Sequence, residues 1–490
     1  MAEELKRQYD IVVLKVELLD SSPNVRFTLQ AKVKGRLADV GTWKSDTSDM
    51  GFPRRERREQ QTYRDITGNL SVAMLDSIRD WLYANGAGNA PLWLHLVKPY
   101  GVLRFVPWER ALGGALPVPI LMLPDFIFPP PRESALGLEV ALCGSAPLDV
   151  EAHWVREAMF HTSRRILDSA ARRTRLHIFT DADFAQDLRE EYMSQGRLGD
   201  DVFVHDPSGA AAHVGRPPTD VDQTGRLRSP WLLWMRDTLR GHSLDVAHFC
   251  GHGWLTRDRG ALLFAESPVE RTRRYLGGPV GQAELGTFLT QVGAWSSAFT
   301  SVYDNASEPG LRALADEIGQ TRPGPLLMHT LANDPSASEV VDAYRFLYGT
   351  EPADAPKSLS LFMYCQPYLV RTQAQAPTGE RRLRGAASHT GLRNLVQARA
   401  VERAVTDESP LQPIIESSGT VQPWIASTER FAEQVQLRFQ QSARDDDAGD
   451  DRTQDVRHEV AFETVNKLRA AVARMAAGDV GGGAASGGAI

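Results

Sequence analysis

The feature that most constrains the fold is a regular alternation, from residue 91 onward, of short apolar runs with segments of helical periodicity. Strands that alternate with helices of this length form βαβ units, whose parallel sheet is covered by helices on both faces. The stretch after residue 181 is polar and rich in Gly and Asp, and no element is assigned to it. The strands are predicted at 91–97, 137–144, 175–181, 244–251, 296–304, 324–331 and 358–365, and the helices at 150–173, 229–239, 281–292, 309–319 and 337–349.

The residues before this alternation have a different pattern. Segments 10–19 and 25–34 have the composition of strands and are separated by turn residues. Segment 71–86 has apolar residues at helical spacing and ends on a glycine, which is a helix stop signal. The charged stretch 52–65 is predicted to be a surface loop. Residues 1–90 are therefore predicted to form a small α+β module.

The strand signal fades after about residue 376, so we assign 91–375 to the α/β domain and 376–490 to a helical C-terminal region. Two helices are predicted in that region, at 428–441 and 459–477, with an acidic run between them. The last ten residues are mostly Gly, Ala and Ser, and neither they nor the acidic run contain enough apolar surface to offset the entropy of ordering. We expect these two stretches to be exposed and disordered.

Composition excludes several classes of protein. The formal net charge of −7 provides no basic field for nucleic acid. No apolar run reaches the roughly 20 residues that span a bilayer, and the charged N-terminus has no signal core. The three cysteines, Cys143, Cys250 and Cys365, are too sparse for a disulfide framework and are expected to be reduced thiols. We therefore expect a cytoplasmic protein that binds neither nucleic acid nor membrane.

One predicted strand ends in a histidine between two glycines, within DVAHFCGHGW at 245–254. His252 in this position, between Gly251 and Gly253, is expected to be accessible and close to backbone amides. Such a side chain can act as general base for a nucleophile one strand away. The alternative is a histidine with no chemical role, because short motifs also occur by chance.

Several segments together resemble a CHAT domain, the caspase-like peptidase domain of clan CD that is related to separase. LRFVPWERAL resembles the family's PWE segment, here Pro107, Trp108 and Glu109. LDVAHFCGHGWL resembles the family's His motif and follows the PWE segment in the same order. The segments GLEVALCGSAP, GQAELGTFLTQVGAWSSAFTSVYDNAS and PGPLLMHTLANDPSASEVVDAYRFLYG resemble the neighbouring strands and helices, so the resemblance covers about 91–370.

The resemblance implies a caspase-like, mostly parallel sheet flanked by helices, with His252 as the catalytic histidine. It also places Tyr303 where the family has its nucleophilic cysteine. Tyr303 lies 51 residues after His252, and caspases place the cysteine about 50 residues after the histidine. A phenol with a pKa near 10 and a bulky ring cannot replace a thiol. Asp304, Asn305 and Ser307 are nearby, but a serine four positions further on would need a different loop.

Another cysteine could in principle act as the nucleophile. Cys250 shares a strand face with His252, but a cysteine within a strand is usually a small buried hydrophobic residue. Cys365 ends the last predicted strand and is the alternative nucleophile, although in a caspase-like sheet that strand is not beside the strand of His252. Cys143 has no better position.

A metal site is a further alternative, because His248, Cys250 and His252 alternate along one strand and are zinc-ligand types. His329 is the one conceivable fourth ligand, and no second ligand pair has suitable spacing. We prefer the interpretation that these residues are simply part of a buried strand, and we predict no metal site. No Gly-rich phosphate loop of a common type is present, so we predict no nucleotide cofactor either.

The sequence thus leads to two hypotheses. In the first, the protein is a bacterial CHAT-like pseudo-peptidase that binds a protein or peptide partner and acts as a regulatory module in signalling or defence. In the second, it is an active CHAT cysteine peptidase that uses His252 with another cysteine. Both require the ends of the strands at 244–250 and 296–302 to be adjacent. The candidate catalytic positions are His252, Tyr303 and Cys365, and the candidate binding residues are Gly251, Gly253, Asp304 and Asn305.

Overall fold

The structure is a computed structural model, and it describes part of the chain. The predictions for 52–65 (beyond Phe52), for the helices at 428–441 and 459–477, and for the acidic and Gly-rich stretches lie outside the described residues. The described residues are 11–19, 24–33, 36–52, 68–124, 137–147, 152–169, 172–214, 227–239, 244–256, 259–269, 277–302, 307–322, 324–349 and 353–370.

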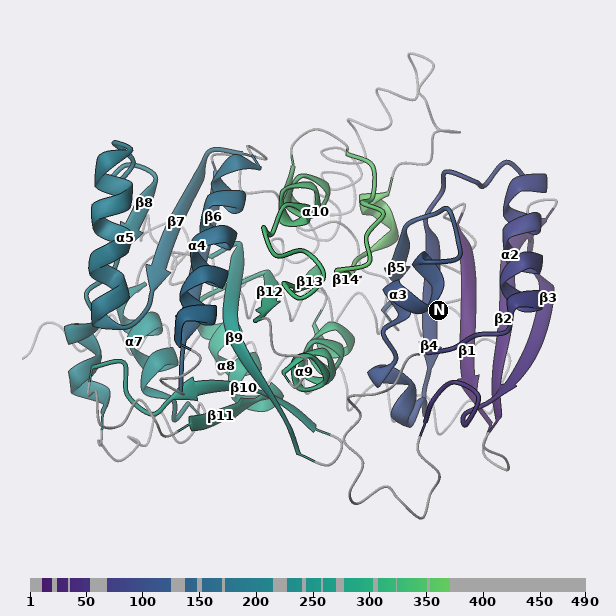
Figure 1. The fold of residues 1–490 in the computed structure, drawn as a ribbon, viewed down its shortest axis with the longest axis horizontal. Helices are drawn as coiled ribbons and strands as arrows, with labels where there is room; N and C mark the ends of the chain where they lie inside the picture. Colours follow the sequence, from purple (N-terminus) through teal and green to yellow (C-terminus); the bar gives the residue numbers. More distant parts are fainter. Residues whose placement is uncertain are drawn as a thin grey trace, which may run out of the picture.

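Within the described residues, strands and helices alternate around a largely parallel sheet of 14 strands (Figure 1). The order along the sheet is β3-β2-β1-β4-β5-β14-β13-β12-β9-β6-β7-β8, and β10 and β11 extend it beside β9. The strands are β1 (Val12–Leu18), β2 (Asn24–Val33), β3 (Arg36–Asp46), β4 (Leu92–Val97), β5 (Ile120–Met122), β6 (Leu138–Ser145), β7 (Thr174–Phe179), β8 (Val202–Val204), β9 (Val246–Thr256), β10 (Arg259–Ala265), β11 (Gly277–Gly281), β12 (Ser296–Ser301), β13 (Leu326–Thr330) and β14 (Leu361–Tyr364).

Helices cover both faces of the sheet. Buried side chains of α4, α5 and α10 belong to one core cluster, and those of α2, α3, α7, α8 and α9 belong to a second. No helix among the described residues is long and apolar enough to cross a bilayer. The α-helices are α2 (Val72–Ala84), α3 (Trp108–Gly113), α4 (Ala152–Asp168), α5 (Ala182–Ser194), α7 (Pro230–Thr238), α8 (Gln282–Gln291), α9 (Glu308–Thr321) and α10 (Glu339–Tyr348); short 3₁₀ turns are η3 (Gly101–Phe105), η5 (Pro207–His213) and η7 (Pro367–Leu369).

The centre of the sheet consists of parallel strands that are buried on both faces. β9 lies between β6 and β12, and β12 in turn pairs with β13. All six residues of β12 and all five of β13 are buried, as expected for parallel strands covered by helices on each side. In β9 and β12, Val246 pairs with Ser296 and Gly251 with Ser301. The predicted adjacency of these two strands is therefore confirmed.

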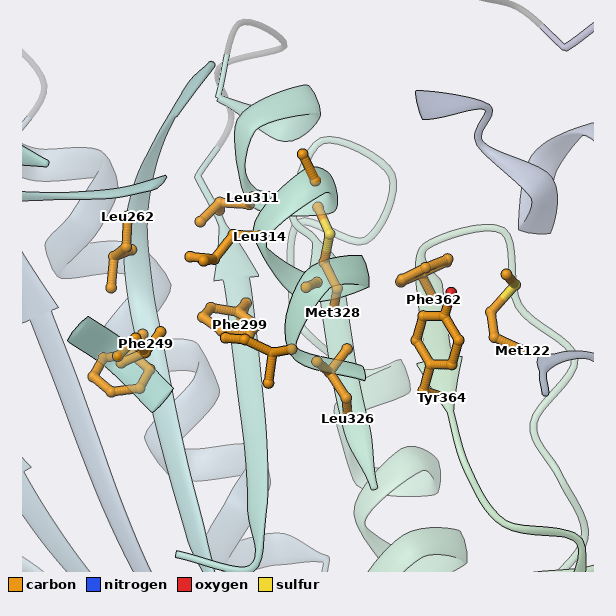
Figure 2. Close-up of a cluster of buried hydrophobic side chains, with 14 of the residues drawn as sticks. Met122, Phe249, Leu262, Phe299, Leu311, Leu314, Leu326, Met328, Phe362 and Tyr364 are labelled. Carbon is orange, nitrogen blue, oxygen red and sulfur yellow. The ribbon is translucent and has the colours of Figure 1, made fainter. Parts of the chain in front are cut away.

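The core under α9 shows how this helix is fixed to the sheet. Figure 2 shows Phe249 of β9 and Phe299 of β12, whose rings stack at a centroid distance of 5.9 Å. Leu311 and Leu314 project from α9 toward the same cluster, which Leu262 of β10 joins. These apolar contacts hold the first two turns of α9 against β9 and β10.

The N-terminal strands continue the same sheet. β1 pairs antiparallel with β2 and parallel with β4, and β4 pairs with β5. β5 joins the rest through one pair, Met122 with Tyr364 of β14. The predicted strands and helix of residues 1–90 are present, and the sheet runs across residue 90. The division into domains at that residue stays a prediction.

Helix α5 lies in the polar segment after residue 181, for which the sequence pattern predicted no element. Its start is fixed by Asp181, whose side chain accepts a hydrogen bond of 3.1 Å from the backbone N–H of Phe184. Phe184, Leu188 and Tyr192 lie at helical spacing and are buried. The high polarity of the segment belongs to the exposed face of an amphipathic helix.

Candidate functional site

The parallel pairing of β9 with its two neighbours, β6 and β12, ends at Gly251, and His252 is the next residue. Gly251 pairs with Ser145 on one side and with Ser301 on the other. β9 then continues as an antiparallel partner of β10, with His252 opposite Leu263. The expectation that His252 is accessible at a strand end is wrong, because the strand continues through the motif and the histidine is 4% exposed. His252 nonetheless lies at the carboxyl edge of the sheet, where α/β proteins place functional side chains.

The imidazole of His252 contacts a serine hydroxyl. Its Nδ1 atom lies 3.1 Å from Oγ of Ser307, a residue that is 2% exposed. Ser307 immediately precedes α9, yet its side chain makes no capping hydrogen bond to that helix. From the sequence, Ser307 was expected to need a different loop to act with His252. The structure brings the two side chains together.

Gly253 allows α9 to approach the backbone of β9. A Cβ atom at Gly253 would lie 2.2 Å from the carbonyl oxygen of Ser307 and 2.6 Å from the backbone nitrogen of Leu311. The contact is reciprocal, since a Cβ atom at Gly310 would lie 2.6 Å from the nitrogen of Trp254. At Gly251 the nearest atom would be at 3.5 Å, an ordinary contact. Gly253 thus has a packing role, and the binding role predicted for both glycines stays a prediction.

Four charged side chains form a network behind the first turn of α9. Arg110 of α3 donates to both carboxylate oxygens of Glu308, at 3.1 and 2.6 Å. Arg312 donates to Glu308 at 2.9 Å and to both oxygens of Glu109. Burial alone would raise the pKa of Glu308, but the charges and hydrogen bonds of Arg312 and Arg110 outweigh it and hold that pKa below its ordinary value. The network joins α3 to the residue that follows Ser307.

Residues 303–306, between β12 and Ser307, lie outside the described residues. They include three of the predicted site residues, namely Tyr303, Asp304 and Asn305. Their assignment to the nucleophile position and to binding remains a prediction from the sequence.

The three cysteines are buried and poorly suited to thiolate chemistry. Burial raises the pKa of Cys250 to about 12, and it also raises the pKa of Cys365 and that of Cys143. Cys365 directly follows β14, which β13 and β12 separate from β9. The expectation that the strand of Cys365 is not beside the strand of His252 is confirmed. A thiol with such a pKa is protonated at neutral pH and is a weak nucleophile.

The histidines of the alternative metal site are bound by protein groups. His248 contacts the hydroxyl of Tyr344 through Nδ1 at 2.9 Å and that of Thr300 through Nε2 at 2.8 Å. His329 contacts Asp334 at 3.2 Å. Among the described residues, no group of three or more His, Cys, Asp or Glu is arranged to hold a metal ion.

One residue that sequence reasoning missed lies beside this site. Trp254 shares a strand face with His252 and is 54% exposed, whereas most large aromatic side chains of the described residues are buried. The signal was available, because an aromatic residue two positions after a candidate catalytic histidine is placed to contact a ligand. An exposed tryptophan next to a candidate site is typical of a binding surface.

The chain was compared with known proteins, and neither a family model nor a curated protein matches it. The functional argument therefore starts from the geometry around His252.

Proposed function

We propose that residues 91–375 form a CHAT-like domain with a caspase-like arrangement of its sheet, and that it binds a protein or peptide beside His252. In this proposal the domain is a pseudo-peptidase with respect to thiol chemistry, and it acts as a regulatory module in a bacterial signalling or defence system. The proposal combines the sequence resemblance with one structural observation, the placement of His252 at the carboxyl edge of β9 beside β12.

That placement supports the proposal because the spacing of the motif could have had other outcomes. The His motif and the proposed nucleophile segment are 51 residues apart in sequence. The ends of their strands are adjacent only when the two strands are parallel neighbours in the sheet. β9 and β12 are such neighbours, and the helix α8 between them makes the crossover. The burial of all three cysteines favours the pseudo-peptidase over the active cysteine peptidase.

The partner is expected to be a peptide segment because the edge of the site presents an aromatic side chain. Trp254 offers a large apolar surface and an indole N–H donor. Such residues often dominate the binding energy of protein interfaces. A segment that covers Trp254 would lie directly beside the His252–Ser307 contact.

Selection from a random peptide library displayed on phage, followed by fluorescence anisotropy with the selected peptides, tests the proposal. Trp254→Ala should weaken binding by about 10-fold or more, as expected for a central aromatic contact. Met193→Ala is the matched control, because Met193 is 67% exposed on α5, away from this edge. If the selected peptides bind the Trp254 variant as tightly as the wild type, the binding site is elsewhere and the proposal is wrong.

A further inference from the structure

We infer that Ser307 and His252 form a nucleophile–base pair, and that Ser307 can accept an acyl group from a peptide or ester that reaches this edge of the sheet. The substrate class rests on the proposed function, since it assumes that a peptide is bound beside Trp254. The pair itself rests on geometry. It replaces the missing thiol with a hydroxyl from a different position in the loop.

The contact has the geometry that general-base catalysis requires. At 3.1 Å, Oγ of Ser307 is within hydrogen-bond distance of Nδ1 of His252. When the ring proton is on Nε2, Nδ1 is an acceptor and Ser307 donates to it. Both side chains are buried, so their hydrogen bond has little competition from water.

The position of Ser307 at the start of α9 favours negative charge on its oxygen. α9 has 14 residues, and its N-terminus carries the positive end of the helix dipole. Serine residues that cap helices have extended backbone angles, whereas Ser307 has helical ones, with φ −78° and ψ −31°. Ser307 makes no capping bond, and its hydroxyl is directed to His252. The fold thus uses this side chain for the histidine rather than for the helix.

Two features fix the pair in place. The close packing at Gly253 sets the backbone of Ser307 against β9, because no side chain separates them. The bonds from Arg110 and Arg312 to Glu308 hold the next residue. A nucleophile and its base remain aligned only when their backbones are held this rigidly.

Another imidazole–hydroxyl contact among the described residues, that of His248 with Thr300, lies within the strands rather than at the carboxyl edge. Both of its residues are fully buried, and burial together with the charge of His329 lowers the pKa of His248 to about 3. His248 is therefore a poor base at neutral pH, and the pair serves as an internal control for reactivity.

The chemical step is ordinary acyl transfer. Oγ of Ser307 attacks the carbonyl carbon of an ester or amide, and its proton moves to Nδ1 of His252. The bond to the leaving alcohol or amine breaks, and that group takes the proton from His252. Water then attacks the acyl-serine, His252 accepts its proton, and the released Oγ takes the proton back, so that the acid is formed and both residues are restored.

Reaction with diisopropyl fluorophosphate tests the pair, because this small reagent forms a bond to a reactive serine oxygen and releases fluoride. Mass spectrometry of digested wild-type protein should place the adduct on Ser307 and not on Thr300. His252→Ala should slow labelling by about 100-fold or more, the usual share of a general base. Ser307→Ala should abolish it. Ser145→Ala is the control, because Ser145 is buried at the same edge and its Oγ accepts from the N–H of Ala265 at 2.7 Å instead of facing a histidine.

A second variant protects the test against a failure to fold. Ser307→Cys nearly keeps the size of the side chain and places a thiol beside the imidazole of His252. In the background with Cys143, Cys250 and Cys365 changed to alanine, it should react with iodoacetamide at least about 10-fold faster than the same chain carrying His252→Ala, because an adjacent imidazolium lowers a thiol pKa. Circular dichroism confirms folding of each variant. Labelling that does not depend on His252 in either experiment, or no labelling of Ser307 in the wild type, would overturn the inference.

The outcomes separate this inference from the proposed function. Ser307→Ala should retain peptide binding while it loses the organophosphate adduct. If peptides bind through Trp254 but Ser307 is inert, only the nucleophile–base pair is wrong. If Ser307 is labelled and no peptide binds through Trp254, only the peptide-binding proposal is wrong.

Discussion

Arg312 on α9 donates hydrogen bonds to both carboxylate oxygens of Glu109 on α3, across 203 residues of sequence, and both side chains are buried. The Pro107-Trp108-Glu109 segment is thereby attached to the helix that begins directly after Ser307. The guanidinium also lies over the ring of Phe362, 4.8 Å from its centroid. The segment that we propose to be equivalent to the PWE segment of the CHAT family thus holds α9, and with it the contact between Ser307 and His252.

Arg312→Met should lower the free energy of unfolding by about 3–5 kcal/mol, because it leaves Glu109 buried without its cation. Equilibrium denaturation in urea measures the change. Glu109→Gln added to Arg312→Met should recover about 1 kcal/mol or more, since the uncompensated charge is then removed. Arg79→Met is the control, because the ion pair of Arg79 with Asp76 is exposed and should contribute less than about 1 kcal/mol. Equal losses for Arg312→Met and Arg79→Met would contradict the account of the network.

Gly253→Ala should destabilise the protein, while Gly251→Ala should be tolerated. The added methyl group at 253 meets backbone atoms of Ser307 and Leu311, so α9 has to move away from β9. The expected loss is about 1–3 kcal/mol, as for other overpacked sites. At 251 the same group makes ordinary contacts. Thermal or urea denaturation of the two variants compares them directly, and equal stability would show that the two backbones are not in close contact.

Stability should decrease on acidification partly because of His248. Burial and the charge of His329 lower its pKa to about 3, whereas the unfolded residue has a pKa of about 6.5. Between these values the unfolded chain binds a proton that the folded chain does not, so the free energy of unfolding falls as pH decreases from 6.5 toward 3.

His248→Gln, which can still bond to Thr300 and Tyr344, should therefore lose about 3 kcal/mol less than the wild type between pH 7 and pH 4. Urea denaturation at a series of pH values measures this difference. His153→Gln, at an exposed position on α4, is the control. Parallel pH profiles for the wild type and His248→Gln would show that this histidine does not contribute.

Periodicity predicted the central strands and most of the helices, but it missed several elements and many of the contacts. The missed elements are β3, β5, β8, β10, β11, α3 and α5. The alternation of apolar runs identified β6, β9, β12 and β13 because buried parallel strands are apolar along their whole length. It could not show that β5 meets β14, since that pairing joins segments far apart in sequence. The partner of His252 was missed for a similar reason. Spacing points to a position one strand end away, but the path of the chain into α9 decides which hydroxyl reaches the ring, and only Gly253 hinted at that close approach.

A thiol-directed activity probe should label the wild-type protein no more than a variant with Cys143, Cys250 and Cys365 all changed to alanine. The reason is that burial raises the pKa of each thiol, so almost no thiolate is present at neutral pH. Gel fluorescence and mass spectrometry compare the two proteins. Labelling of Cys365 that disappears in His252→Ala would instead support the hypothesis of an active cysteine peptidase.

Tyr303→Cys tests the sequence alignment itself, in competition with Ser307→Cys. If position 303 is the nucleophile position, the new thiol should have a lowered pKa because an imidazolium at His252 stabilises the thiolate. It should then react with iodoacetamide faster than Cys143 or Cys365, and His252→Ala should return it to the behaviour of a thiol with a pKa of about 8.5. Oγ of Ser307 lies 3.1 Å from Nδ1 of His252. We therefore expect the rate of thiol labelling to depend more strongly on His252 for a cysteine at position 307 than for one at position 303. A thiol at 303 whose reaction rate is the same with and without His252 would show that the 51-residue spacing matches the family by coincidence.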